Sequence, residues 1–286
     1  MSCVNSPNAK FSFIHVNTKF RSNYYNTSSS DFNYQFPNSY SNIKSIKLDS
    51  ICIPNTWYLF SSKKKNNVFF IETTDSCNGL ELHQIIIPDG NYTVEQLEGF
   101  LNKTYFYLSE SSNGLQNIKF SIHENSLKSI FSVIDGTSSS FTFDVKFAHS
   151  ELKNICYGAG WILGFRYGKY TSITSYVMSE GLFDGGGDRY IYFCLDDFNH
   201  SSLNPHEVCF EKYSINESVL AKIYLADGKF AINIDDSSNS SNTTVKTRVF
   251  SGPIDLSKVK IRILDQYGEV IDLNHMDFSF SLQICG

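Results

Sequence analysis

The segment formed by residues 43–58 constrains the fold of this chain more than any other. Apolar Ile46 and Leu48 alternate with charged neighbours, and this period of two is typical of a strand with one buried face. The three residues before Pro54 are all apolar, and Pro54 has no backbone N–H with which to continue a strand ladder. An aromatic cluster begins at Trp57. We therefore expect the segment to lie in the middle of a β-fold, with the remaining chain arranged around it.

The C-terminal part of the chain repeats the same period over two runs. The alternating apolar residues are Val259, Ile261 and Ile263 in the first run and Phe278, Phe280, Leu282 and Ile284 in the second. Similar runs occur along the whole chain, including one over residues 31–36 that we expect to end at Pro37. Together they predict about a dozen strands, at the even spacing of a β-sandwich or jelly roll.

One helix is predicted, directly after the turn formed by residues 88–90. Thr93 is a good N-cap residue, and Gln96 follows it at the spacing of a capping box. Leu97, Phe100 and Leu101 then form an apolar stripe at helical spacing, which is typical of a helix that packs on a core.

These elements predict an all-β protein: an elaborated jelly-roll β-sandwich with one short helix. The Ser-rich segments between strands are short enough to be loops, and no linker separates two parts of the chain. We expect an N-terminal tail over residues 1–10, followed by a single jelly-roll-like domain with loop insertions over residues 11–286.

Composition narrows the possible partners. The net charge of −5 argues against nucleic-acid binding, which needs a clustered basic surface. No apolar run approaches the ~18 residues of a transmembrane helix, and polar residues 1–10 do not resemble a signal peptide. The seven cysteines form no C-x-x-C pair. This spacing favours reduced thiols in an intracellular setting, several of them buried in strands, over a zinc site.

Two glycine-rich segments invite a functional reading. Residues 158–164 resemble a dinucleotide fingerprint, but they have one residue too many before Gly164 and no βαβ unit around them. A tight turn into buried structure explains them better. Asp184 and Asp188 flank three glycines, and their two carboxylates could hold a cation. The segment lacks the further oxygen ligands that calcium needs. A loop is the better interpretation.

The remaining polar motifs also have structural explanations. Asp196 and Asp197 follow a buried run, but adjacent strand residues point to opposite faces, so the two carboxylates need not share a site. Lys63, Lys64 and Lys65 suit a charged hairpin tip that blocks strand pairing. Neither a metal-binding histidine motif nor a G-x-S-x-G elbow occurs. We therefore predict a protein that is not an enzyme, with no catalytic, cofactor-binding or metal site and no cofactor.

The order of several motifs resembles a family of virion structural proteins. The motifs are residues 15–21, 31–37, 43–58, 87–93, 163–165, 252–256, 264–268 and 277–280. In this order they are similar to minor-capsid or penton-type proteins of large nucleocytoplasmic DNA viruses. The resemblance covers most of the chain, from His15 to Ile284.

The resemblance implies a jelly-roll capsid subunit without catalytic residues. It implies that the chain assembles with itself, as a homo-oligomer such as a pentamer or trimer, and with other capsid proteins. The expected location is the virion, after assembly in the host cytoplasm, with neither nucleic-acid binding nor a membrane span. The alternative is a receptor- or glycan-binding β-sandwich head of a spike or fibre, which an exposed Trp57 or exposed tyrosines lining a shallow pocket would favour.

Overall fold

The computed structural model describes residues 10–75, 79–110, 113–150, 154–199, 201–210, 214–215, 218–226, 228–236 and 246–286. The expected tail over residues 1–10 lies outside the described residues except for Lys10. Cys3 and Cys77 also lie outside the described residues.

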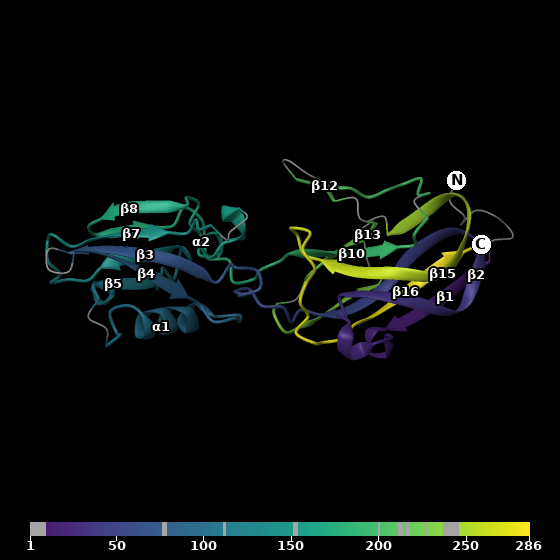
Figure 1. Cartoon of the computed structure of the whole chain (residues 1–286), viewed down its shortest axis with the longest axis horizontal. Helices are drawn as coiled ribbons and strands as arrows, with labels where there is room; N and C mark the ends of the chain where they lie inside the picture. Colours follow the sequence, from purple (N-terminus) through teal and green to yellow (C-terminus); the bar gives the residue numbers. More distant parts are fainter. Residues whose placement is uncertain are drawn as a thin grey trace. The chain divides into compact units, whose positions relative to one another are not determined.

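The chain divides into two compact units (Figure 1). Unit 1 contains residues 1–57 and 188–286, and unit 2 contains residues 58–187. Each unit has its own cluster of buried apolar side chains. This differs from the single domain expected over residues 11–286. The insertion is not a loop, because its 130 residues bury enough apolar surface to form a separate core.

The regular elements described in unit 1 are mostly strands. They are β1 (Phe11–Asn17), β2 (Asp31–Pro54), β10 (Tyr190–Asp196), β11 (Val208–Cys209), β12 (Ser214–Ile215), β13 (Val219–Tyr224), β14 (Ile232–Asp236), β15 (Thr247–Leu264) and β16 (Ser279–Cys285). Two short 3-10 turns, η2 (Thr18–Phe20) and η3 (Tyr24–Asn26), separate β1 from β2.

The long strands β2 and β15 each belong to two layers. In one layer β1 pairs with β16, and β16 with residues 45–52 of β2. On its other side, this part of β2 pairs with residues 247–249 of β15 and, over residues 50–54, with β14. In the other layer residues 31–35 of β2 pair with residues 258–262 of β15, β15 with β10, and β10 with β13. Long strands that bend from one sheet into the next are a known way to build the corner of a sandwich.

The resulting strand order is that of a jelly roll. We number eight segments along the chain: β1, residues 31–35 of β2, residues 45–54 of β2, β10, β13, β14, residues 258–264 of β15, and β16. One layer has the order first, eighth, third and sixth, and the other has the order second, seventh, fourth and fifth. Phe193 of β10 and Phe280 of β16 belong to different layers, yet their ring centroids lie 5.1 Å apart. The two layers therefore pack face to face, which confirms the all-β jelly-roll prediction.

The prediction that Pro37 ends a strand is wrong, because β2 continues through it to Pro54. Gln35 pairs with Lys258 and Tyr40 with Leu256, so residues 36–39 of β2 lie opposite a single residue of β15. This bulge requires no ladder hydrogen bond from Pro37, and a proline is tolerated at such a position.

Unit 2 contains two sheets and the main helix. Its elements are β3 (Val68–Asp75), β4 (Gly79–Ile86), α1 (Val94–Thr104), η4 (Leu115–Asn117), β5 (Ile118–Ile122), β6 (Ser129–Val133), β7 (Thr142–Lys146), η5 (Ile155–Tyr157), α2 (Ala159–Ile162), β8 (Lys169–Ile173) and β9 (Tyr176–Met178). One sheet has the order β4-β3-β7-β8 and the other β5-β6-β9. Phe69 of β3 and Phe131 of β6 meet with ring centroids 5.9 Å apart, so the core lies between the sheets.

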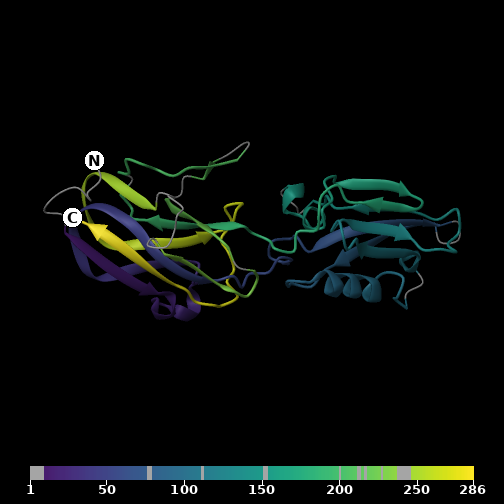
Figure 2. The ribbon, with the colours of Figure 1, turned by 180° about the vertical axis from the view of Figure 1, so that it is seen from behind.

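The predicted capping box starts α1. Thr93 Oγ1 accepts the Gln96 backbone N–H, and the Gln96 side chain accepts the Thr93 N–H. Leu97 and Leu101 are buried against the core of unit 2. Asn102 bonds both backbone groups of Phe120 at 2.8 and 2.9 Å, so α1 covers the outer edge of β5, as the view from behind in Figure 2 also shows.

Candidate functional site

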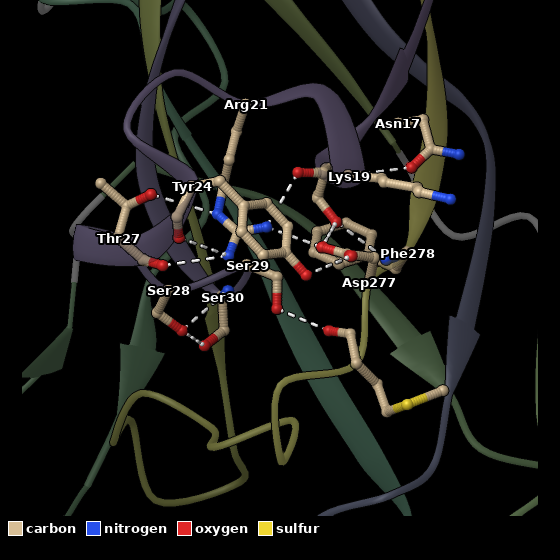
Figure 3. A network of polar contacts seen from close by, with 12 residues as sticks. Asn17, Lys19, Arg21, Tyr24, Thr27, Ser28, Ser29, Ser30, Asp277 and Phe278 are labelled. Carbon is tan, nitrogen blue, oxygen red and sulfur yellow. Dashed lines mark hydrogen bonds and ion pairs between the residues drawn. The ribbon is translucent and has the colours of Figure 1, made fainter.

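Arg21 organises the polar cluster that joins the two ends of the described chain in unit 1 (Figure 3). Its side chain is only 6% exposed. Nε donates to Thr27 Oγ1, one terminal nitrogen to the Thr18 carbonyl and Asp277 Oδ1, and the other to the carbonyls of Tyr24 and Thr27. All five guanidinium N–H groups are thus used, as burial of this cation requires.

Asp277 is the main acceptor in this cluster. Its Oδ1 lies 2.6 Å from the Arg21 guanidinium and accepts the Thr18 hydroxyl at 2.9 Å, and its Oδ2 accepts the Tyr24 hydroxyl at 3.1 Å. The Tyr24 ring also stacks on the guanidinium, 4.1 Å from ring centroid to Cζ. Thr18 and Phe278 exchange two further hydrogen bonds, each 2.9 Å long.

The serines at positions 28–30 connect the end of the same loop to the segment before β16. Ser29 Oγ donates to the Met276 carbonyl at 2.7 Å, and Ser30 Oγ to the Ile271 carbonyl at 2.5 Å. The loop over residues 18–30 is therefore held to the segment before β16 along its length. This leaves Phe20 79% and Tyr25 96% exposed on a well-anchored surface.

A groove of about 460 Å³ lies beside this loop on the outer face of the first layer. Its lining includes His15, Ser281, Ser50 and Cys52, with the apolar side chains of Phe20 and Ile234. His15 Nδ1 and Ser281 Oγ are hydrogen bonded at 2.7 Å. The lining also contains Asp236 and the apolar residues Val16, Ile51 and Phe280. Polar groups among apolar side chains can hold a ligand or a segment of a partner in one orientation.

The carboxylates of Asp196 and Asp197 have different partners and do not share a site, in agreement with the sequence analysis. Asp197 is buried and forms a 2.5 Å ion pair with Arg248, which also donates to the Leu195 carbonyl. Asp196 Oδ1 accepts the Phe198 backbone N–H at 2.8 Å. The ion pair and this hydrogen bond join β15 to the end of β10. Burial, and secondly the positive charge of Arg248, lower the pKa of nearby His206.

The glycine-rich segments also have structural roles. A Cβ on Gly160 would lie 2.4 Å from Phe147 Cγ, so this glycine allows the short helix α2 to pack on the core. Asp184 Oδ1 accepts the Gly186 N–H at 3.2 Å. Asp188 Oδ2 accepts the Trp57 indole N–H at 2.8 Å. Trp57 is only 2% exposed and therefore offers no stacking surface for a sugar.

The three lysines lie in a turn, as predicted. Residues 62–65 form this turn, and Lys65 has a φ of 58°. Ser62 binds both carboxylate oxygens of Asp89, and the Asn66 side chain bonds the backbone of Leu59 and Ser61. These hydrogen bonds hold the backbone of the turn, which carries the three lysines at or near the surface.

Within the described ranges, no group of three or more His, Cys, Asp or Glu side chains is placed to hold a metal ion. Of the five cysteines that the structure describes, Cys194 and Cys285 are buried in strands, as expected. No helix in the described part of the chain is long and apolar enough to span a membrane.

Sequence reasoning missed the Arg21–Asp277 pair. Both residues belong to motifs that carried the family resemblance, but the partners lie 256 positions apart.

Comparisons with known proteins find similarity among solved structures. No protein-family model matches the chain, and no curated protein sequence is similar to it. Among solved structures, the chain aligns with the penton protein of mavirus at 8% identity and a TM-score of 0.48. The alignment covers 96% of this chain and 99% of that chain. At such values the jelly-roll assignment rests on the strand order of unit 1.

Proposed function

We propose that the chain is a structural capsid protein of a large DNA virus, a minor-capsid or penton-type subunit that assembles through protein–protein contacts. The observation that carries this proposal is the complete jelly-roll order of unit 1, a fold that viral capsids use widely. The inference from fold to role is by analogy, and the motif order noted in the sequence supports the same class.

Surface chemistry agrees with an assembly role. Unit 1 exposes Phe11, Phe13 and Phe20 near the outer face of one layer, and unit 2 exposes Leu80 and Leu82 on β4. Apolar side chains gathered on rigid sheets favour contacts with neighbours. Modest contacts summed over many symmetric copies hold a shell together. In this proposal the subunit has no catalytic role and no cofactor, and it reaches the virion after assembly in the host cytoplasm.

Light scattering and negative-stain microscopy of the full chain test the proposal, alone and after co-expression with the major capsid protein of the same virus. We expect a discrete pentamer or trimer, or co-assembly into particles. A protein that stays monomeric in both settings over a wide concentration range contradicts the proposal.

A second function is favoured by one specific observation. Phe20 is exposed and lines the groove together with His15 and Ser281, and the exposed Tyr25 belongs to the same loop over residues 18–30. Exposed aromatic rings next to polar groups suit a sugar. The alternative is therefore a receptor- or glycan-binding head. Binding on a glycan array that is lost in Tyr25→Ala and kept in Tyr167→Ala, a variant of an exposed tyrosine in unit 2, would favour it.

A further inference from the structure

Strand β4 of unit 2 presents an open sheet edge. It pairs with β3 over eight residues without a register shift. In an antiparallel strand the N–H and C=O of one residue point to the same side, and the side alternates along the strand. Ile86 turns both groups away from β3, to the Tyr105 hydroxyl at 3.3 and 3.1 Å. Leu80, Leu82 and Gln84 therefore also turn their backbone groups outward.

These outward groups have no hydrogen-bond partner among the described residues. The side chains on the outer face of β4 are uncharged, and Leu80 is 68% and Leu82 59% exposed. Proteins normally protect such an edge with a lysine, a proline, a bulge or a covering segment. The outer edge of β5 in the same unit is covered in this way, by Asn102 and Glu98 of α1.

We propose that the β4 edge pairs with β4 of a second copy of this chain, antiparallel about a two-fold axis that passes beside Leu82. In this register Leu82 lies opposite the Leu82 of the other copy, and Leu80 opposite its Gln84. The open backbone groups of both copies then satisfy one another. The result is one continuous sheet across the two molecules, with the four exposed leucines on one face.

A polar pair across the two copies agrees with this register. On the inner face it places Glu81 opposite the His83 of the other copy, at both symmetry-related positions. Within one copy Glu81 Oε2 already lies 3.7 Å from His83 Nε2, so both side chains occupy the same region of the strand. On the neighbouring strand β3, Glu72 lies opposite Leu82 and forms an ion pair with Lys146. A carboxylate opposite an imidazole can accept a hydrogen bond from it across the strands, whereas two carboxylates in that place would repel each other.

The inference stands apart from the proposed capsid role, since it rests on the edge chemistry of β4 and not on shell assembly. Its test is disulfide trapping in the full chain, with diamide as the oxidant. Leu82→Cys places two thiols directly opposite each other, about 5.5 Å apart between Cα atoms, which a disulfide spans. Leu80→Cys is the matched control, because its two copies are offset by four residues, about 14 Å along the strand.

We expect a cross-linked dimer with Leu82→Cys and none above the wild-type background with Leu80→Cys. In light scattering, Leu82→Lys should halve the mass of the associated species. Leu108→Lys, at an exposed position in the turn after α1, should not change it. Equal cross-linking of both cysteine variants, or a mass unaffected by Leu82→Lys, would overturn the inference even if the protein assembles through other surfaces.

Discussion

Arg21 and Asp277 lie 256 residues apart in the sequence and form a 2.6 Å ion pair that is largely buried. The pair joins the loop after β1 to the segment before β16. Since β1 and β16 are neighbours in the first layer, it locks together the two ends of the jelly roll.

Breaking this pair should destabilise unit 1 strongly. Arg21→Ala removes the main cationic partner of the partly buried Asp277 carboxylate, and we expect a loss of about 3 kcal/mol, the lower end of the cost of breaking a buried ion pair. Lys260→Ala is the matched control, because the Lys260–Asp31 pair is 3.4 Å long and more than one third exposed on both sides, and such pairs contribute about 1 kcal/mol or less. Urea unfolding of both variants measures the difference, and equal losses would contradict a special role for Arg21.

Phe280→Asp should abolish folding of unit 1. Phe280 is 2% exposed and packs on Phe193 and Phe278, and the variant places an uncompensated carboxylate among apolar side chains. Phe13→Asp changes an exposed residue of β1 and should leave the fold intact. Amide dispersion in NMR spectra reports both results, and a normally folded Phe280→Asp variant would show that the assignment of β16 is wrong.

Gly160→Ala should destabilise unit 2 by about 1–3 kcal/mol, the usual cost of overpacking a core. The added methyl group would overlap the Phe147 ring, since its nearest atom is only 2.4 Å away. Gly99→Ala provides the control within α1, where nothing lies within 4 Å of the new Cβ, and it should stabilise by about 0.5–1 kcal/mol. Thermal unfolding should move in opposite directions for the two variants.

Charge reversal of Lys63, Lys64 and Lys65 to glutamate should weaken assembly and leave folding unchanged. The turn carries these residues at the surface, while Asn66 and Asp89 hold its backbone. The matched variant with three glutamines separates loss of positive charge from gain of negative charge. Mass in solution and the unfolding midpoint are the two measurements; a fall in the midpoint alone would assign the lysines to stability.

Acid should weaken unit 2 through Glu180. Burial alone would raise the pKa of this carboxyl, but hydrogen bonds from the Tyr170 hydroxyl and the Arg166 backbone N–H outweigh it, so the pKa lies below its ordinary value of 4.5. Burial first, and then this hydrogen bond, raise the pKa of Tyr170 to about 12.

Because the folded protein holds Glu180 ionised, its contribution to stability is present above pH 4.5 and is lost as the pH falls through the lowered pKa. Glu180→Gln should flatten this part of the stability profile. Unfolding measured from pH 3 to pH 6 for both proteins checks the sign, and an unchanged acid slope in the variant would contradict it.

Local chemistry was readable in the sequence. The alternation ending in Phe278, Phe280, Leu282 and Ile284 predicted β16, and Thr93 with Gln96 predicted the start of α1. Both features depend on the spacing of neighbouring residues, which sets the face that a strand buries and the donors that a helix end must satisfy.

Only the tertiary structure decided which distant residues meet. The sequence did not show that Arg21 pairs with Asp277, or that Trp57 is buried and donates its indole N–H to Asp188. It also did not show that β2 continues through Pro37 and belongs to both layers. It also suggested one domain where residues 58–187 form a core of their own. Each of these features depends on long-range pairing, in which many partners are chemically equivalent and the choice is made by the packing of the whole chain.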